Sequence, residues 1–330
     1  MSNTWARGRS VARQLAGERG RQLYRRVRAL PQVQAAPAAP PPPPRVVYIN
    51  HPSAEKPRVL PLQFPPPGYL GQLSDEFQAR MALEREFIEF DDCYFYHATT
   101  LPDGTEIPGP WDLRGHEDEY LGFTDVKGRR VLEFGPATGH MSYYMEQAGA
   151  EVVSFDVGFD VGNQIIPWDC DDLMGIRMSQ NRELGALRNS WWYLHRARQS
   201  RVRMVYGDIY NLPGDLGSFD VATFQSILLH LRNPFDALEQ AARRTTSTIV
   251  VTEPVDPEIE NTDSMRFFPT RGRSFSTGWW SFSAATIEAM LDTLGFRNLR
   301  RSEHTQTHFQ MHDMDTEPVQ MKMFTVVGTK

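Results

Sequence analysis

The feature that constrains this chain most is a strand–turn–helix unit in its central third. The apolar run at 130–134 predicts a strand, a turn carrying Gly135 and Gly139 follows, and a helical pattern comes next. Glycine lets a backbone approach a ligand closely, and a helix start directs unpaired N–H groups at an anionic group. Ala137 and His140 stand where the dinucleotide-binding fingerprint has glycine, which argues against a nicotinamide dinucleotide.

Strands and helices alternate from this unit to the end of the chain. The alternation predicts βαβ crossovers and a parallel sheet, which is an α/β fold. The last two strands have no helix between them, so we expect them to pair antiparallel at one edge of the sheet. The further predicted strands are 151–156, 202–206, 219–224, 248–253, 297–303 and 322–328, and the predicted helices are 142–147, 173–197, 234–243 and 283–294.

Polar residues stand where three successive predicted strands end. Asp156 ends the second strand, 17 positions after Gly139, where a carboxylate can accept hydrogen bonds from ribose hydroxyls. Asp208 follows the third strand and can accept an adenine amine while Ile209 packs against the ring. Gln225 follows the fourth strand, at the crevice where ligands bind in such sheets. The alternative for each acid is an ordinary solvated turn residue.

These segments, in this order, resemble those of class I S-adenosylmethionine (SAM)-dependent methyltransferases over about residues 128–330. The resemblance implies a Rossmann-like seven-stranded, mostly parallel sheet with helices on both faces and an antiparallel last strand, and it implies SAM as the cofactor. It places Gly135, Ala137 and Gly139 around the methionine part. By the same resemblance Glu133 holds the loop or the ammonium group, Asp156 binds the ribose, Asp208 and Ile209 bind the adenine, and Gln225 lies beside the cofactor.

A narrower resemblance covers three shorter segments, 226–234, 278–283 and 290–296. They are similar to a subgroup that includes bacterial tRNA wobble-uridine carboxymethyltransferases and many small-molecule methyltransferases. In the tRNA enzymes the residue before the histidine is typically a tyrosine that helps to bind a carboxylated SAM. Here that residue is Leu229, which argues against carboxymethyl transfer.

His230 is the candidate catalytic residue, because an imidazole close to the end of the fourth strand has a suitable acidity for a general base. The alternative is a local hydrogen bond at the start of the next helix.

We expect methyl transfer to oxygen or nitrogen of a small molecule or glycan. The alternatives are a tRNA-modifying (carboxy)methyltransferase and a non-catalytic SAM-binding regulatory module.

Charge is divided unevenly along the chain. Residues 1–45 hold nine arginines and one acid, a net charge of +8, so the remainder must carry −14 to give the total of −6. An acidic body is a poor match for a phosphate backbone, so nucleic acid is the less favoured partner. The arm could be solvated and disordered, a peripheral anchor on anionic lipid or a mitochondrial-type presequence, and we favour the first. The segment 31–44 is a proline–alanine linker.

Three domains follow from this organisation: the basic arm and linker at 1–45, an N-terminal cap at 46–127, and the methyltransferase domain at 128–330. The last contains an inserted helix at 173–197 and a lid at 260–282 that would cover the acceptor.

Several features of the sequence bear on location and metals. The sequence contains no apolar run of eighteen residues, so we expect no transmembrane helix. The N-terminus also lacks the apolar core of a secretory signal. Two cysteines give neither a disulfide framework nor metal-ligand spacing, so we expect a reducing, cytoplasmic setting. His304, His308 and His312 recur every four residues, but their surroundings predict a polar loop, and we assign no metal site.

Overall fold

The computed structural model describes residues 72–158, 164, 173–269, 278–309 and 317–330. The chain divides into two units, Met1–Tyr48 and Ile49–Lys330, and all described residues belong to the second. The predicted arm at 1–45, His312 and the middle of the predicted lid, 270–277, lie outside the described residues.

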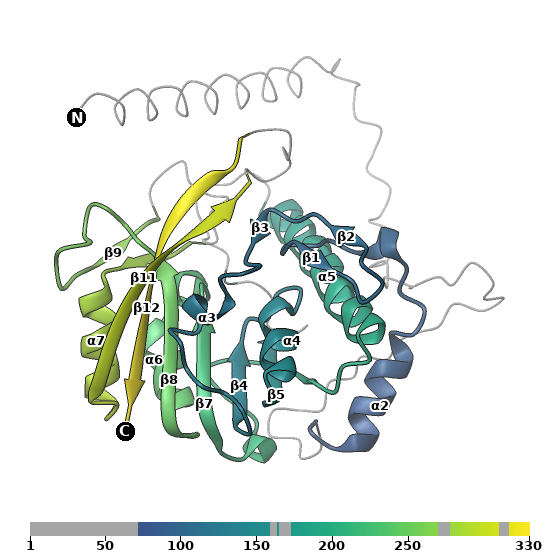
Figure 1. Ribbon diagram of the computed structural model, residues 1–330, viewed down its shortest axis with the longest axis horizontal. Coiled ribbons are helices and arrows are strands. Elements are labelled where there is room, and N and C mark those ends of the chain that lie inside the picture. The colour runs from purple at the N-terminus through teal and green to yellow at the C-terminus, as the bar shows by residue number, and fades with distance from the viewer. Residues whose placement is uncertain (1–71, 159–163, 165–172, 270–277, 310–316) are drawn as a thin grey trace, which may run out of the picture. The chain divides into compact units, whose positions relative to one another are not determined.

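One eight-stranded sheet with the order β3-β11-β12-β8-β7-β4-β5-β6 forms the centre of the second unit (Figure 1). The five strands from β4 to β8 run parallel, and β12 is antiparallel to both β8 and β11. The predicted α/β class and the antiparallel last strand are therefore confirmed. The strands are β3 (Trp111–Asp112), β4 (Arg130–Phe134), β5 (Glu151–Val157), β6 (Arg203–Gly207), β7 (Phe219–Gln225), β8 (Thr245–Pro254), β11 (Asn298–His308) and β12 (Val319–Thr329).

The last two strands pair antiparallel as predicted, with β12 between β8 and β11. The two-residue strand β3 then pairs with the far end of β11 and adds an eighth strand to the predicted seven. Long-range pairing of this kind leaves no local periodicity, so a single sequence does not reveal it.

Helices cover both faces of this sheet, as predicted (Figure 1). The apolar residues of α6 and α7 join one buried cluster, and those of α2, α4 and α5 join the other. Side chains cap three of these helices: Ser74 accepts from Phe77 N, Asn233 from Asp236 N and Ser283 from Thr286 N. The helices are α2 (Asp75–Glu84), α3 (Glu117–Tyr120), α4 (His140–Gln147), α5 (Leu173–Ala197), α6 (Pro234–Ala242) and α7 (Ala284–Thr293).

The region before β4 shares its core with the sheet. Met81 and Ile88 belong to the same buried cluster as Val131 of β4 and Trp191 of α5. Two short two-stranded sheets complete the described residues. They pair β1 (Thr99–Thr100) with β2 (Glu106–Ile107), and β9 (Met265–Phe267) with β10 (Trp280–Phe282).

One secondary-structure prediction was wrong. His304 and His308 lie in strand β11 instead of a polar loop, because β12 pairs with every residue of the segment. Burial alternates there, with His304 and Gln306 buried and Thr305 exposed. Polar side chains on both faces concealed that alternation from the hydrophobic pattern.

Candidate functional site

The parallel register brings the carboxyl ends of four strands to one edge of the sheet. Phe134, the last residue of β4, pairs with Phe155 of β5 and with Phe224 of β7, and Phe155 pairs with Val205 of β6. The residues that follow these positions therefore meet along one line. Ligands bind at this edge in open α/β sheets.

The glycine turn after β4 is built from left-handed backbone. Gly135, Ala137 and Gly139 have φ values of 67°, 49° and 85°. A Cβ on Gly139 would lie 2.7 Å from Tyr143 Cε2 and 2.8 Å from Trp191 Cδ1. Glycine at this position therefore lets the side chains of Tyr143 and Trp191 pack directly against the turn.

Helix α4 starts directly after this turn with no side-chain cap. Its first backbone N–H groups are therefore available to an anionic group. Beside it, the indole Nε1 of the fully buried Trp191 has no hydrogen-bond partner among the described residues. No signal in the sequence distinguishes the unpaired N–H of this tryptophan from that of a packing residue.

Asp156 lies in β5, near its carboxyl end, with 13% of its side chain exposed. Its Oδ1 accepts from the N–H of Val157 at 2.8 Å, and its Oδ2 lies 4.0 Å from Nε of Arg188 in α5. Burial raises the pKa of Asp156, and the charge of Arg188 opposes that rise. The carboxylate is thus held in place by α5.

Asp208 and Ile209 follow β6 as predicted. The Oδ1 atom of Asp208 accepts from the N–H of Tyr210 at 3.0 Å and so closes a turn. Ile209 is partly buried against the core. The Tyr210 hydroxyl donates to Gln164 at 2.9 Å, and the Gln164 carbonyl accepts from the indole of Trp279 at 2.6 Å, which joins this turn to the predicted lid.

Glu133 lies beneath the glycine turn, with 1% of its surface exposed. Its Oε2 accepts from the hydroxyls of Ser142 in α4 and, at 2.7 Å, of Ser154 in β5. Burial raises the pKa of Glu133 to about 7, and the two serine hydrogen bonds oppose the rise. Glu133 therefore ties the start of α4 to two strands.

The end of β7 carries the remaining predicted residues. Gln225 is half-buried, and its Nε2 is buried without a hydrogen-bond partner among the described residues. His230 ends a 3₁₀ turn, η3 (Leu228–His230), that follows two residues after β7. The structure thus brings all of the predicted site residues to the same edge of the sheet.

Glu253 was missed by the sequence analysis. It lies near the end of β8 with 1% of its surface exposed, and its Oε1 accepts from the N–H of Leu228 at 2.9 Å. Burial raises its pKa to about 8, against hydrogen bonds from the backbone of η3. An acid at the end of an apolar strand, the signal that identified Asp156, was present here too.

A second missed contact covers the glycine turn from the region before β4. The backbone N–H of His97 donates to Thr138 Oγ1 at 3.3 Å, and the His97 Nδ1 lies 3.0 Å from the same oxygen. Burial, with a smaller effect from His140, lowers the pKa of His97 to about 3. A neutral histidine from the predicted cap therefore anchors the turn.

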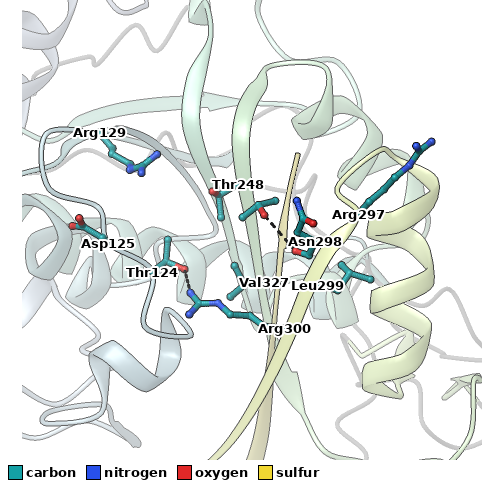
Figure 2. Close-up of a pocket in the computed structure, with 10 residues that line it drawn as sticks. Thr124, Asp125, Arg129, Thr248, Arg297, Asn298, Leu299, Arg300 and Val327 are labelled. Carbon is teal, nitrogen blue, oxygen red and sulfur yellow. Dashed lines mark hydrogen bonds between the residues drawn. The ribbon is translucent and has the colours of Figure 1, made fainter.

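A hollow of about 610 Å³ lies at the opposite edge of the sheet (Figure 2). It lies between Thr248 near the start of β8 and Asn298 at the start of β11, away from the predicted residues. Arg300 in this hollow donates to Thr124 at 3.2 Å.

Across the described ranges, no group of His, Cys, Asp and Glu side chains could hold a metal ion, and no described helix is long and apolar enough to cross a membrane.

Comparison with known proteins identifies the family of the chain. A family model described as "Methyltransferase domain" matches residues 116–301, more than half of the chain. The chain belongs to this methyltransferase family. It is a class I SAM-dependent methyltransferase, as the sequence resemblance indicated, and SAM is its cofactor.

Individual relatives of this methyltransferase are distant. A tRNA U34 carboxymethyltransferase from Idiomarina loihiensis is 26% identical over 186 residues, which is 56% of this chain and 50% of that protein. The methyltransferase therefore spans about half the length of this curated relative.

Two solved structures are also similar. The N-terminal domain of EvdMO1, in the presence of S-adenosylhomocysteine (SAH) and D-fucose, is 17% identical, covering 79% of this chain and 99% of its own with a TM-score of 0.43. A 1,6-didemethyltoxoflavin N1-methyltransferase from Burkholderia thailandensis is 14% identical, with coverages of 66% and 78% and a TM-score of 0.40. The strand order establishes the fold independently of these likenesses.

Proposed function

We propose that this methyltransferase transfers the SAM methyl group to an oxygen or nitrogen atom of a small molecule or glycan. One observation carries the proposal: the glycine turn, two strand-end acids and Gln225 meet at the carboxyl edge of β4 to β7. We assign Gly135, Ala137 and Gly139 to the methionine part of SAM, Asp156 to the ribose, and Asp208 with Ile209 to the adenine.

Unpaired donors at this edge support that assignment. Trp191 Nε1 and Gln225 Nε2 are buried and have no partner among the described residues, and the start of α4 offers further N–H groups. Buried donors normally meet an acceptor. The carboxylate of SAM is suited to Trp191 and the start of α4, and Glu133 keeps that helix start in place.

When bound, SAM would supply the methyl group: a lone pair of the acceptor oxygen or nitrogen attacks the methyl carbon in line, and the carbon–sulfur bond breaks with its electron pair going to sulfur, which leaves as the neutral thioether of SAH. Alignment alone lowers much of the barrier of such a reaction. His230 is the candidate base that takes the acceptor proton, and Glu253 holds the η3 turn that carries it.

Calorimetric titration of the full chain with SAM tests this proposal. Asp156→Ala should bind SAM about 100-fold more weakly than the wild type, because it removes two charge-assisted hydrogen bonds. Asp292→Ala, which removes an exposed aspartate from α7, is the matched control and should bind like the wild type. Failure of the folded wild type to bind SAM, or unchanged binding by Asp156→Ala, would overturn the proposal.

The similarity to a tRNA U34 carboxymethyltransferase supports a second candidate, modification of tRNA. In that case the basic arm would supply the electrostatic attraction that the acidic body lacks. Deletion of residues 1–45 distinguishes the two candidates. A tRNA enzyme should lose salt-dependent tRNA affinity in a filter-binding assay, whereas a small-molecule enzyme should retain its turnover.

A further inference from the structure

Four polar side chains gather beside Gln225, and none of them is among the predicted site residues. We call them the neutral cluster: Tyr120, Ser226, His304 and Gln306. The Tyr120 hydroxyl lies 3.0 Å from Ser226 Oγ and forms a hydrogen bond with Gln306. The Tyr120 ring meets the His304 ring edge-on, with the centroids 5.5 Å apart.

The cluster contains buried polar atoms without partners among the described residues. They are both ring nitrogens of His304 and the Oε1 atom of Gln306, in residues that are only 8% and 2% exposed. Leaving a buried polar atom unpaired costs about 1–3 kcal/mol, so native proteins rarely keep several together without a reason. Among the described residues, these three atoms beside the end of β7 are left to hydrogen-bond a ligand.

No member of the cluster carries a charge near neutral pH. Burial raises the pKa of Tyr120 and lowers that of His304. The cluster therefore offers neutral donors and acceptors together. A carboxylate or phosphate would instead call for arginine or lysine, whereas a hydroxyl group both donates and accepts and so matches this set.

Aromatic rings continue the cluster along β11 and β3. The half-buried Trp111 lies across from His308, with their ring centroids 4.1 Å apart. The ring centroid of Tyr96, which is also half-buried, lies 6.3 Å from that of Trp111. Apolar ring surface beside a few fixed polar groups is the usual composition of a small-molecule site.

We propose that the neutral cluster recognises the methyl acceptor and selects an uncharged, polyhydroxylated ring of the saccharide or cyclitol class over an anionic one. This inference rests on the proposed function, because the cluster matters for transfer only if the methyl group lies at the end of β7. A ring hydroxyl held by Tyr120 and Ser226 would be directly beside Gln225.

Saturation-transfer NMR on the full chain tests the inference. The neutral probes are methyl α-D-glucopyranoside, methyl β-D-galactopyranoside and myo-inositol, and the anionic counterparts are D-glucuronate and glucose 6-phosphate. At least one neutral probe should bind, and the anionic rings should bind at least about 5-fold more weakly, which is the worth of one net hydrogen bond.

Variants connect this binding to the cluster. Tyr120→Phe, which keeps the ring, and Gln306→Leu should each weaken neutral-probe binding about 5-fold or more. Gln320→Leu replaces an exposed glutamine on β12 of the same hairpin and should bind like the wild type. Calorimetry with SAM on every variant shows that the fold and the cofactor site persist.

Three results would overturn the inference: no neutral probe binds, anionic rings bind equally well or better, or the Tyr120 and Gln306 variants bind like the wild type. The proposed function fails separately, by absence of SAM binding in the wild type.

Discussion

The carboxyl edge of the sheet has two halves that are built differently. The cofactor half, at the ends of β4, β5 and β6, contains acidic side chains that each lie near or just after the end of their own strand. The acceptor half, at the ends of β7, β8 and β11, contains the neutral cluster, whose Tyr120 and Ser226 lie 106 positions apart in the sequence. The position of each residue in the cofactor half follows from its own strand, whereas long-range packing brings the residues of the acceptor half together.

Each half also buries one glutamate. Glu133 in the cofactor half accepts hydrogen bonds from two hydroxyls through one oxygen. Glu253 in the acceptor half accepts from the backbone of η3, and its Oε2 has no hydrogen-bond partner among the described residues. In the cofactor half Glu133 therefore links the start of α4 to two strands, a role that we call the brace. In the acceptor half Glu253 holds the η3 turn in place.

The largest expected effect on stability is at Glu133, the brace of the cofactor half. Glu133→Ala should lower the free energy of unfolding by about 3 kcal/mol, because it creates a cavity and removes the acceptor that the Ser142 and Ser154 hydroxyls share, leaving them only each other as partners. Glu133→Gln keeps an acceptor and should lose less. Urea denaturation at pH 6 measures both, and a loss below about 1 kcal/mol for the alanine variant would contradict the brace.

The second prediction concerns pH and Glu253. Its ordinary pKa of 4.5 rises to about 8 in the folded state, so the folded protein holds this proton more tightly than the unfolded chain. The resulting stability is fully present below about pH 4.5 and is lost as the pH rises toward 8. Glu253→Gln removes this dependence.

Relative to the wild type, Glu253→Gln should therefore gain roughly 2 kcal/mol in free energy of unfolding between pH 6.5 and pH 9. Urea denaturation at pH 6.5, 7.5 and 9 provides the comparison, with the exposed Glu76→Gln as the matched control. A difference that stays constant with pH would show that Glu253 is ionised throughout the range.

The third prediction compares adjacent tryptophans of α5. Trp191 Nε1 is unpaired among the described residues, whereas Trp192 Nε1 donates to the Tyr206 hydroxyl at 3.0 Å. Trp191→Phe should weaken SAM binding about 10-fold or more, the loss expected for one hydrogen bond to a charged acceptor, whereas Trp192→Phe should leave it unchanged. Equal effects of the two variants in calorimetry would contradict the assignment of Trp191 as a residue that binds SAM.

The smallest expected effect is at Ala137, whose φ of 49° is strained for alanine. Ala137→Gly should stabilise the fold by about 0.5 kcal/mol, since the relief of strain slightly exceeds the entropy cost of glycine. Gly139→Ala is the opposite control, because its Cβ would meet Tyr143 and Trp191. Thermal unfolding measures both, and destabilisation by Ala137→Gly would contradict the strain argument.

The two halves also differ in how far the sequence predicted them. An acid at or just after a strand end is a short contiguous pattern, so the sequence alone placed Asp156 and Asp208 at the carboxyl edge of the sheet, where the structure has them. The same rule applied to Glu253, but no motif drew attention to the fifth strand. Hydrophobic periodicity likewise predicted α5 with the bounds that the structure shows, Leu173–Ala197.

The acceptor half was not predictable in the same way. Tyr120 comes from a four-residue helix, and His304 from a strand whose polar residues resembled a loop. Their meeting depends on the pairing of β11 with β12 and on the packing of α3, neither of which leaves a local signal. The short strand β3 was missed for the same reason.

Hydrogen–deuterium exchange with and without SAM tests the central claim most directly, because it reports on every segment of the edge at once. The account predicts slower exchange at 134–140, 156–158, 207–210 and 225–230 on SAM addition, with no change at 124–129 and 297–300. Protection confined to 124–129 and 297–300, which contribute to the hollow of Figure 2, or no protection anywhere, would contradict it.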